Sequence, residues 1–203
     1  EKYKDVFNGK LGCHPTAKTK IRLRPDAKPH WQRPYSVPFA RQEAFRRELQ
    51  SMIKDDVLVR VGPSEWGFPS FIIPKKDLRV RWISDFRVLN EMIIREPHIL
   101  PRIQDIMNGR STYKYFTKID LSLMLYCFRL DAASLHICVI SLEEGNYAYT
   151  RLPMGVKISP DVAQAHMTEM LQGITCSVYM DDVGIWTDGN FDQHLEIIDK
   201  VMS

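Results

Sequence analysis

The segment "SVYMDDVGIW", residues 177–186, constrains the fold more than any other stretch of this 203-residue chain. Two apolar, β-prone runs flank a pair of adjacent carboxylates, Asp181 and Asp182, which is typical of a tight hairpin between antiparallel strands. Asp is common in turns because it tolerates left-handed backbone angles, so a turn explains the pair by itself. Adjacent carboxylates also repel each other unless a cation lies between them, so a metal site is the alternative.

The length suits one large domain or two small ones, and the four cysteines are scattered without a CxxC pair or a zinc-like cluster with histidine. We therefore predict no disulfide framework and no structural zinc, and we expect a reducing, intracellular environment. No apolar run reaches the length of a membrane span, and no signal peptide opens the chain. We accordingly expect neither membrane insertion nor secretion.

The charges are unevenly distributed along the chain. Residues 1–102 hold 21 Lys and Arg against 12 Asp and Glu, whereas residues 103–203 hold 7 against 13. A basic half beside an acidic half suits a protein that binds phosphates with one part and cations with the other. An accidental asymmetry of the solvated surface explains the same numbers, so the charge distribution alone does not distinguish a functional from an accidental pattern.

The order of the expected elements predicts an α+β fold. In the first part we expect a Pro-rich extended arm (1–38), an amphipathic helix (40–56), and strands at 57–61, 68–74 and 80–86, the last two joined by a hairpin tip at 75–79. In the second part we expect a strand (113–121), a short helical stretch (121–127), a hairpin (136–152), a helix (159–173), a hairpin (176–187) and a closing helix (190–203). This order suggests an antiparallel sheet backed by helices.

A third carboxylate, Asp120, ends the apolar strand "FTKID", where an unpaired buried acid would be costly. If this strand neighbours the hairpin, Asp120 and Asp181 project from adjacent strand ends toward one point and form an oxygen-ligand site suited to Mg²⁺. A pair of such ions about 3.5–4 Å apart activates the attacking oxygen and stabilises the leaving oxygen in phosphoryl transfer. Each carboxylate alone is better explained as a strand-end cap or a turn; together they favour the metal site.

A basic hairpin supplies groups that complement this acidic site. Its cationic side chains are Lys75, Lys76, Arg79 and Arg81. Lys offers a point charge and Arg a bidentate fork to phosphate oxygens, so the hairpin tip could fold over a triphosphate. The alternative is an exposed hairpin that its charge keeps soluble.

Four segments appear in the order and spacing of the motifs of reverse transcriptases: "PSEWGFPSFIIPKKDLRVRWISDFRVLN", "YFTKIDL", "YTRLPMGVKISP" and "VYMDDVGIW". Over nearly its whole length the chain resembles the polymerase of gypsy-type LTR retrotransposons. The resemblance implies a right-hand polymerase fold with an extended arm at 1–38, a basic, β-rich fingers-like subdomain at 39–112 and a palm-like catalytic subdomain at 113–203. No part of the chain resembles a thumb or an RNase H region.

The resemblance also implies an activity and assigns roles to residues. It implies RNA-directed DNA polymerisation with two Mg²⁺ ions, or Mn²⁺ in their place, in which the primer 3′-hydroxyl attacks the α-phosphate of a dNTP. Asp120, Asp181 and Asp182 match the catalytic, metal-binding aspartates, with Asp182 supporting the site more than ligating. The implied nucleotide-binding positions are Lys75, Arg81, Leu121, Ser122, Leu125 and Met154. The implied template and primer positions are Asp85, Arg87, Gly155, Tyr179 and Met180.

The chain departs from the family pattern after the first aspartate and in the basic hairpin. Leu125 occupies the aromatic position that packs under the sugar, and Leu78 replaces a usual Gly; Ser, Gly and Gln give way to Leu123, Met124 and Cys127. Tolerated variation and a decaying copy both fit these changes. The alternatives to the polymerase are a decayed or co-opted nucleic-acid-binding module and a related polymerase that acts on another template.

The resemblance implies partners and a location as well. The expected partners are an RNA/DNA template-primer, dNTPs and other regions of a polyprotein, namely protease, RNase H and integrase. The expected location is a cytoplasmic particle or the nucleus.

Overall fold

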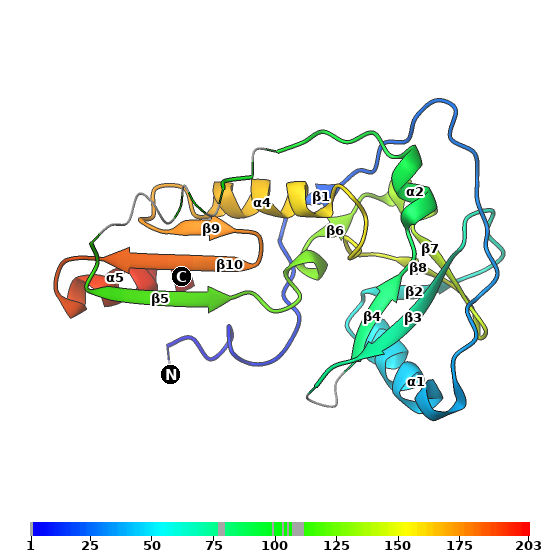
Figure 1. Ribbon diagram of the computed structural model, residues 1–203, viewed down its shortest axis with the longest axis horizontal. Coiled ribbons are helices and arrows are strands. Elements are labelled where there is room, and N and C mark those ends of the chain that lie inside the picture. The colour runs from blue at the N-terminus through cyan, green and yellow to red at the C-terminus, as the bar shows by residue number, and fades with distance from the viewer. Residues whose placement is uncertain (1, 77–79, 99, 103, 105, 107–111) are drawn as a thin grey trace. The chain divides into compact units, whose positions relative to one another are not determined.

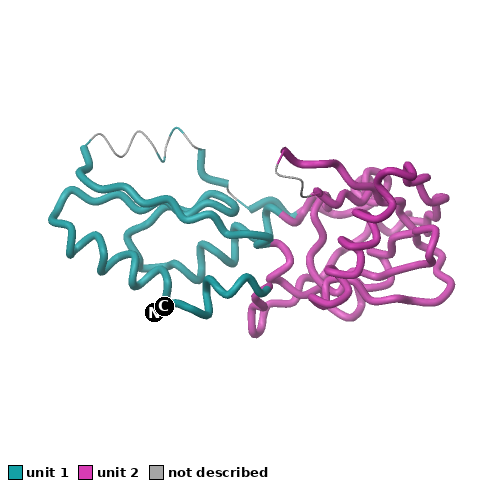
Figure 2. The backbone as a smooth tube through the Cα atoms, turned by 90° about the horizontal axis from the view of Figure 1, so that it is seen from below, with its two compact units in different colours: residues 1–10, 96–124, 160–203 teal, residues 11–95, 125–159 magenta. Residues whose placement is uncertain are grey.

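The computed structural model describes residues 2–76, 80–98, 100–102, 104, 106 and 112–203. The chain forms two compact units (Figure 2). Unit 1 comprises Glu1–Lys10, Glu96–Met124 and Pro160–Ser203, and unit 2 comprises Leu11–Arg95 and Leu125–Ser159. The predicted hairpin tip lies partly outside the described residues, which exclude Asp77, Leu78 and Arg79.

Unit 2 is built on a five-stranded sheet in the order β2-β8-β7-β3-β4 (Figure 1). Its strands are β2 (Leu58–Val61), β3 (Phe68–Pro74), β4 (Val80–Ser84), β7 (Val139–Leu142) and β8 (Gly145–Tyr149). Neighbouring strands are antiparallel except β3 and β7, which pair in parallel. Helix α1 (Phe39–Lys54) packs against β2 and β4, and its Phe45 stacks on Trp82 with ring centroids 4.6 Å apart. The amphipathic helix expected from the sequence is therefore a core element of this unit.

The compact units differ from the linear ranges expected from the sequence, 39–112 and 113–203. Residues 125–159 fold with unit 2 because β7 and β8 return to the sheet and pair with β3 and β2. Residues 2–7 of the N-terminal arm form turns, and from residue 11 the arm belongs to unit 2. There β1 (Lys18–Thr19) pairs with β6 (Arg129–Leu130).

Unit 1 contains the antiparallel sheet β5-β10-β9 with helices packed on it (Figure 1). The strands are β5 (Tyr115–Asp120), β9 (Ser177–Tyr179) and β10 (Asp182–Thr187), and the helices are α4 (Ser159–Met170) and α5 (Phe191–Met202). Because alternate residues of a strand face opposite sides, Thr117 and Thr187 share the face toward α5. Both hydroxyls hydrogen-bond the buried His194 of α5 at 2.8 Å, so this histidine is structural. The predicted helix-backed antiparallel sheet is confirmed.

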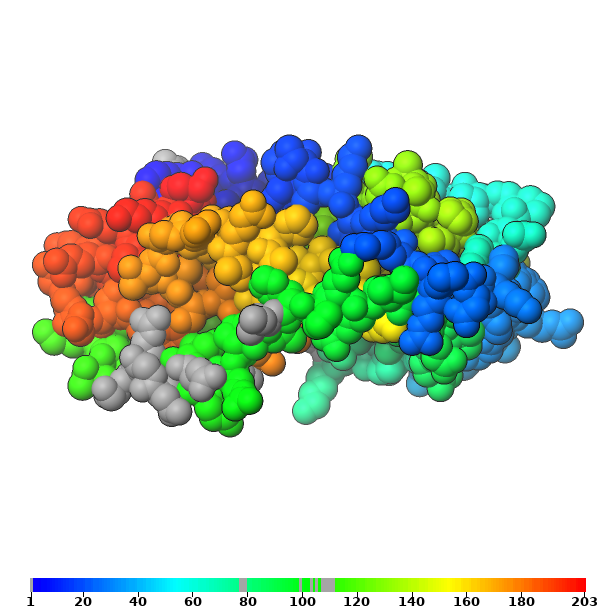
Figure 3. All heavy atoms as spheres, turned by 90° about the horizontal axis from the view of Figure 1, so that it is seen from above, coloured from blue at the N-terminus to red at the C-terminus, as the bar shows by residue number. Residues whose placement is uncertain are grey.

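The start of the chain lies against α5 within unit 1. Figure 3 shows the dark blue N-terminal atoms beside the red atoms of the last helix. The Nζ of Lys2 donates to the carboxylate of Asp199 at 2.6 Å, and the hydroxyl of Tyr3 donates to the same carboxylate. These contacts join both ends of the chain in one unit.

Some short elements were not expected from the sequence. They are α2 (Arg87–Met92), where the prediction ended a strand at 86, and the 3₁₀ turn η2 (Ala132–Ser134). The 3₁₀ turn η1 (Met124–Cys127) lies within the short helical stretch predicted at 121–127. Helix α4 ends at Met170, before the predicted 173, and the chain turns through Gly173 at φ +83°. Within the described residues, no helix has the length and apolar character needed to cross a membrane.

Candidate active site

Two strands of unit 1 bring carboxylates together at one end of the sheet. Asp120 is the last residue of β5, Asp182 is the first residue of β10, and the antiparallel register places them directly opposite each other. Asp181 lies in the adjoining turn, where its carbonyl accepts a hydrogen bond from the Leu121 backbone N–H at 2.8 Å. The sequence predicted that Asp120 and Asp181 project toward one point if these strands are neighbours; the strands are neighbours, and the residue paired directly with Asp120 is Asp182.

The turn itself consists of Met180 and Asp181, not of the two aspartates, because Tyr179 and Asp182 already pair across the hairpin. Met180 has a left-handed backbone with φ +50°, a conformation that costs a non-glycine residue about 1–2 kcal/mol. A buried side chain holds it there: the Oε1 of Gln164 accepts from the Met180 N–H at 2.8 Å, and its Nε2 donates to the Val178 carbonyl at 3.1 Å. Helix α4 therefore fixes the turn that carries Asp181.

The carboxylates at this end of the sheet are negatively charged, and a lysine of β5 contacts one of them. The Nζ of Lys118 lies 2.8 Å from Oδ2 of Asp182. The hydrogen bond to Asp182 raises the pKa of Lys118, and the charges of Asp120 and Asp181 raise it further. The negative charges of all three carboxylates thus act on the Lys118 ammonium.

The donor chemistry fits a hard divalent cation. Carboxylate oxygens are the protein ligands that Mg²⁺ prefers, and Asp120, Asp181 and Asp182 supply them from two adjacent strand ends. Among the residues that the structure describes, no group of three or more His, Cys, Asp or Glu side chains is placed so that it could hold a metal ion by itself. An ion held here would keep water or substrate oxygens among its ligands, as Mg²⁺ usually does.

The other predicted site residues divide between the units. Tyr179, Met180, Leu121 and Ser122 border the carboxylates in unit 1, with Ser122 exposed. The remaining positions lie in unit 2: Lys75 directly after β3, Arg81 in β4, Asp85 and Arg87 around the start of α2, Leu125 in η1, and Met154 and Gly155 in the loop after β8. Each unit therefore presents its own group of candidate residues.

Asp85 and Arg87 bind each other. Arg87 donates from Nε and Nη2 to the two carboxylate oxygens of Asp85 at 2.8 and 2.7 Å, and the Tyr35 hydroxyl donates to Oδ2 at 2.7 Å. The hydrogen bonds from Arg87, assisted by Tyr35, hold the pKa of Asp85 well below its usual value of 3.8. The Arg87 side chain remains 84% exposed, so its outer surface is available to a ligand.

This pair predicts a pH-dependent contribution to stability. The folded-state pKa of Asp85 lies below its ordinary value of 3.8. The contribution of Asp85 to the free energy of unfolding is therefore complete above about pH 4, and it is lost as the pH falls through the folded-state pKa. Asp85→Asn should lower the free energy of unfolding by about 2 kcal/mol at neutral pH. The difference from the wild type should shrink between about pH 4 and about pH 2, as measured by urea denaturation. The exposed Asp26 provides the control Asp26→Asn, and a difference that stays constant with pH would contradict the assignment.

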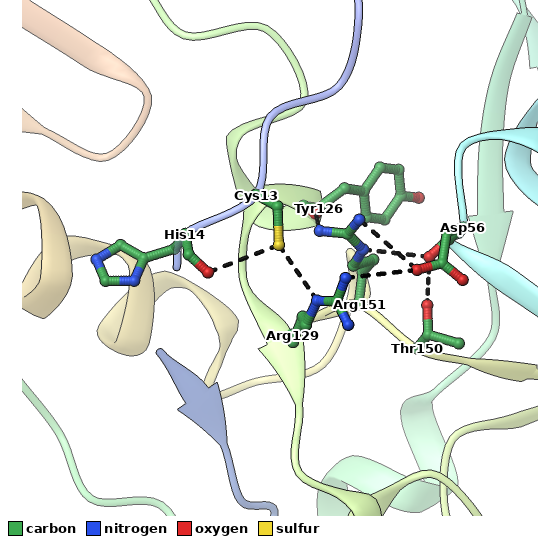
Figure 4. Close-up of polar contacts among 7 residues, drawn as sticks. All are labelled: Cys13, His14, Asp56, Tyr126, Arg129, Thr150 and Arg151. Atoms are coloured by element: carbon green, nitrogen blue, oxygen red, sulfur yellow. Dashed lines mark hydrogen bonds and ion pairs between the residues drawn. The ribbon is translucent and has the colours of Figure 1, made fainter. Parts of the chain in front are cut away.

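Two further side chains hold the "LPMG" loop in unit 2. Asn90 donates from Nδ2 to the Gly155 carbonyl at 2.8 Å, and its Oδ1 accepts from the Lys157 N–H at 2.8 Å. Gly155 has φ +91°, which favours glycine. Figure 4 shows the buried Arg151, whose Nε donates to the Asp56 carbonyl at 3.1 Å and whose Nη2 lies 3.8 Å from the Asp56 carboxylate. The loop is thus fixed at both ends by polar contacts.

The sequence reasoning missed three positioning residues: Lys118, Asn90 and Gln164. Each acts on a partner remote in the sequence or on an adjacent strand, so local spacing does not reveal it. One weak signal was present, since Gln164 lies between Ala163 and Met167 on the buried face of α4. A buried polar side chain in an apolar stripe normally has a hydrogen-bond partner.

The chain is similar to known proteins along most of its length. Residues 73–203 match the family model described as "Reverse transcriptase (RNA-dependent DNA polymerase)". The retrovirus-related Pol polyprotein from transposon 412 of Drosophila melanogaster is 33% identical over 82% of this chain and 14% of its own length. The corresponding polyprotein from transposon gypsy of the same species is 28% identical over 92% of this chain and 19% of its own length. The chain therefore spans less than a fifth of either relative.

Solved structures share the fold. The prototype foamy virus protease–reverse transcriptase superposes with a TM-score of 0.89 at 23% identity, covering 99% of this chain and 27% of that one. The foamy viral protein in complex with an RNA/DNA hybrid gives 0.87 at 24% identity, with 99% and 28% coverage.

Proposed function

The chain belongs to the reverse transcriptase family, and on that premise we propose that it is the polymerase region of a retrotransposon polyprotein that copies RNA into DNA. The observation that carries the proposal is the register of Asp120 opposite Asp182, with Asp181 in the adjoining turn. These carboxylates lie in the two segments that resemble the family motifs, "YFTKIDL" and "VYMDDVGIW", and the strand pairing brings them to one end of a sheet. Polymerisation needs such a concentration of negative charge to hold divalent cations.

Asp120 and Asp181 would hold two Mg²⁺ ions, or Mn²⁺, and Asp182 would support them. When bound, the ions supply activation of the primer 3′-hydroxyl and neutralisation of the charge that develops on the leaving pyrophosphate. The backbone near Leu121 and Ser122 would help to cradle the dNTP phosphates, while the Leu121 N–H itself donates to the Asp181 carbonyl. Tyr179 and Met180 would contact the primer end, and the bonds from Gln164 would keep Met180 in position.

Unit 2 would supply the groups that bind the rest of the substrate. Lys75 and Arg81 would bind the triphosphate, and both are exposed. Leu125 and Met154 would line the nucleotide pocket. Arg87 and Gly155 would lie along the template. Arg87 keeps an exposed guanidinium while it holds Asp85. Since Leu125 is branched and not flat, it would block a 2′-hydroxyl less completely than an aromatic ring.

We assign the fingers-like part to unit 2 and the palm-like part to unit 1, in place of the linear ranges 39–112 and 113–203. A template-primer is the proposed partner, because the foamy viral enzyme was solved with an RNA/DNA hybrid and with double-stranded DNA. Protease, RNase H and integrase regions of the same polyprotein are further proposed partners, in keeping with the length of the Pol relatives. The proposed location is a cytoplasmic particle or the nucleus.

The test is extension of a labelled DNA primer by the 203-residue chain on an RNA template and on a DNA template of the same sequence. We expect Mg²⁺-dependent extension on RNA that stops when EDTA is added. The control adds the downstream region of a polyprotein relative, which would help to bind the duplex. Tight binding of the RNA/DNA hybrid without extension in both cases would instead support a co-opted nucleic-acid-binding module. Extension on the DNA template but not on the RNA template would support a related polymerase that copies DNA.

A further inference from the structure

Lys118 is placed by the sheet to act on the carboxylate site. It precedes Asp120 by two residues on β5, so both side chains lie on the same face of the strand. The residue directly opposite Lys118 on β10 is Gly184, which has no side chain. The ammonium reaches diagonally across the strand pair instead and lies 2.8 Å from Oδ2 of Asp182.

The pair is accessible to solvent, with the Lys118 side chain 55% and the Asp182 side chain 38% exposed. An exposed ion pair stabilises a fold by little, about 0–1 kcal/mol, so this one has little value as a structural support. Its position beside the carboxylates can instead affect how they bind a metal ion. A positive charge beside ligands of a divalent cation competes with that cation for them.

We propose that Lys118 is a resident counter-charge of the active site: it binds Asp182, keeps this carboxylate out of the metal-binding set, and leaves Asp120 and Asp181 as the ligands. This inference rests on the proposed function, since it describes the same metal site. Lys118 is a positioning residue under this proposal, because it acts on the ions through Asp182 and through its own charge.

The proposal makes the effects of Lys118 and Asp182 depend on each other. With Lys118 present, Asp182→Asn removes a carboxylate that does not ligate, so metal affinity should change less than about twofold. With Lys118 replaced by Met, Asp182 is released and can reach the ions. Metal should then bind about threefold more tightly, and Asp182→Asn should now weaken binding about fivefold.

The experiment is a double-mutant cycle on the 203-residue chain. Mn²⁺ is titrated into each variant, and the concentration of free Mn²⁺ is measured by electron paramagnetic resonance to give the metal affinity. The variants are Lys118→Met, Asp182→Asn and the double variant, with Lys118→Arg as the charge-preserving substitution. Lys114→Met is the matched control, because Lys114 is an exposed lysine just before the same strand and far from its Asp120 end. Circular dichroism of each variant verifies that the chain remains folded.

Three outcomes separate the inference from the proposed function. Coupling of the two substitutions, with wild-type affinity in Lys118→Arg and Lys114→Met, supports the inference. Mn²⁺ binding that Asp120→Asn abolishes but that is indifferent to Lys118, or strictly additive effects in the cycle, would overturn the inference alone. Mn²⁺ binding that Asp120→Asn leaves unchanged would overturn the proposed metal site, and the role of Lys118 with it.

Discussion

Replacing either Asp120 or Asp181 by asparagine should lower the rate of nucleotide incorporation by about 10³-fold or more. Asparagine keeps the size of the side chain but removes the negative charge that a divalent cation requires. Asp182→Asn should have a smaller effect, about 10- to 100-fold, which is typical of a residue that supports metal ligands. The measurement is single-turnover addition of one dNTP to a primer on an RNA template.

The control for this series is Asp188→Asn. Asp188 is exposed and follows the opposite end of β10, so the substitution removes the same charge from the same hairpin without touching the site. Its rate should equal that of the wild type. Equal losses in Asp188→Asn and Asp181→Asn would show that overall charge, and not metal ligation, causes the effect.

Gln164→Met should lower the free energy of unfolding by about 2–3 kcal/mol and slow incorporation by at least about tenfold. Methionine has nearly the same volume but cannot bond the Met180 N–H or the Val178 carbonyl, and both bonds come from a side chain that is only 2% exposed. Without them the left-handed turn at Met180 has no side-chain support from α4, and Asp181 is less well positioned. Urea denaturation and the single-turnover rate measure the two effects.

Two further variants sharpen this prediction. Gln164→Glu keeps an acceptor for the Met180 N–H but loses the donor to the Val178 carbonyl and to the Thr168 hydroxyl. The buried carboxylate should also destabilise the fold, but the loss of activity per folded molecule should be smaller than in Gln164→Met. Gln50→Met makes the same chemical change at an exposed position of α1 and should alter neither quantity. A Gln164→Met protein that is destabilised but keeps the wild-type rate would show that the helix supports the fold and not the turn.

The sequence predicted the elements that local pattern determines. The β9–β10 hairpin follows from apolar, β-prone runs on both sides of a polar turn, and α5 follows from helical spacing, with the Asn190–Gln193 capping box at its start. The motif order also gave the family correctly. These features depend on residues close together in the sequence, which single-sequence reasoning can compare.

What the sequence could not predict depends on partners far apart in the chain. The exact turn residues follow from the pairing of Asp182 with both Tyr179 and Asp120, which places Asp182 in the strand. Residues 125–159 join unit 2 because β7 pairs in parallel with β3, a contact between segments about seventy residues apart, as in other crossover connections. No local propensity encodes such a pairing.

The central claim is that Asp120 and Asp181 hold the divalent cations on which DNA synthesis depends. Iron-mediated cleavage tests it most directly: Fe²⁺ takes the place of Mg²⁺, ascorbate and peroxide generate hydroxyl radicals at the bound ion, and the backbone cuts are mapped by mass spectrometry. We predict cuts confined to the chain near Asp120 and near Asp181, which excess Mg²⁺ suppresses and Asp120→Asn abolishes. Cuts elsewhere in the chain, or cuts at these positions that persist in Asp120→Asn, would contradict the account.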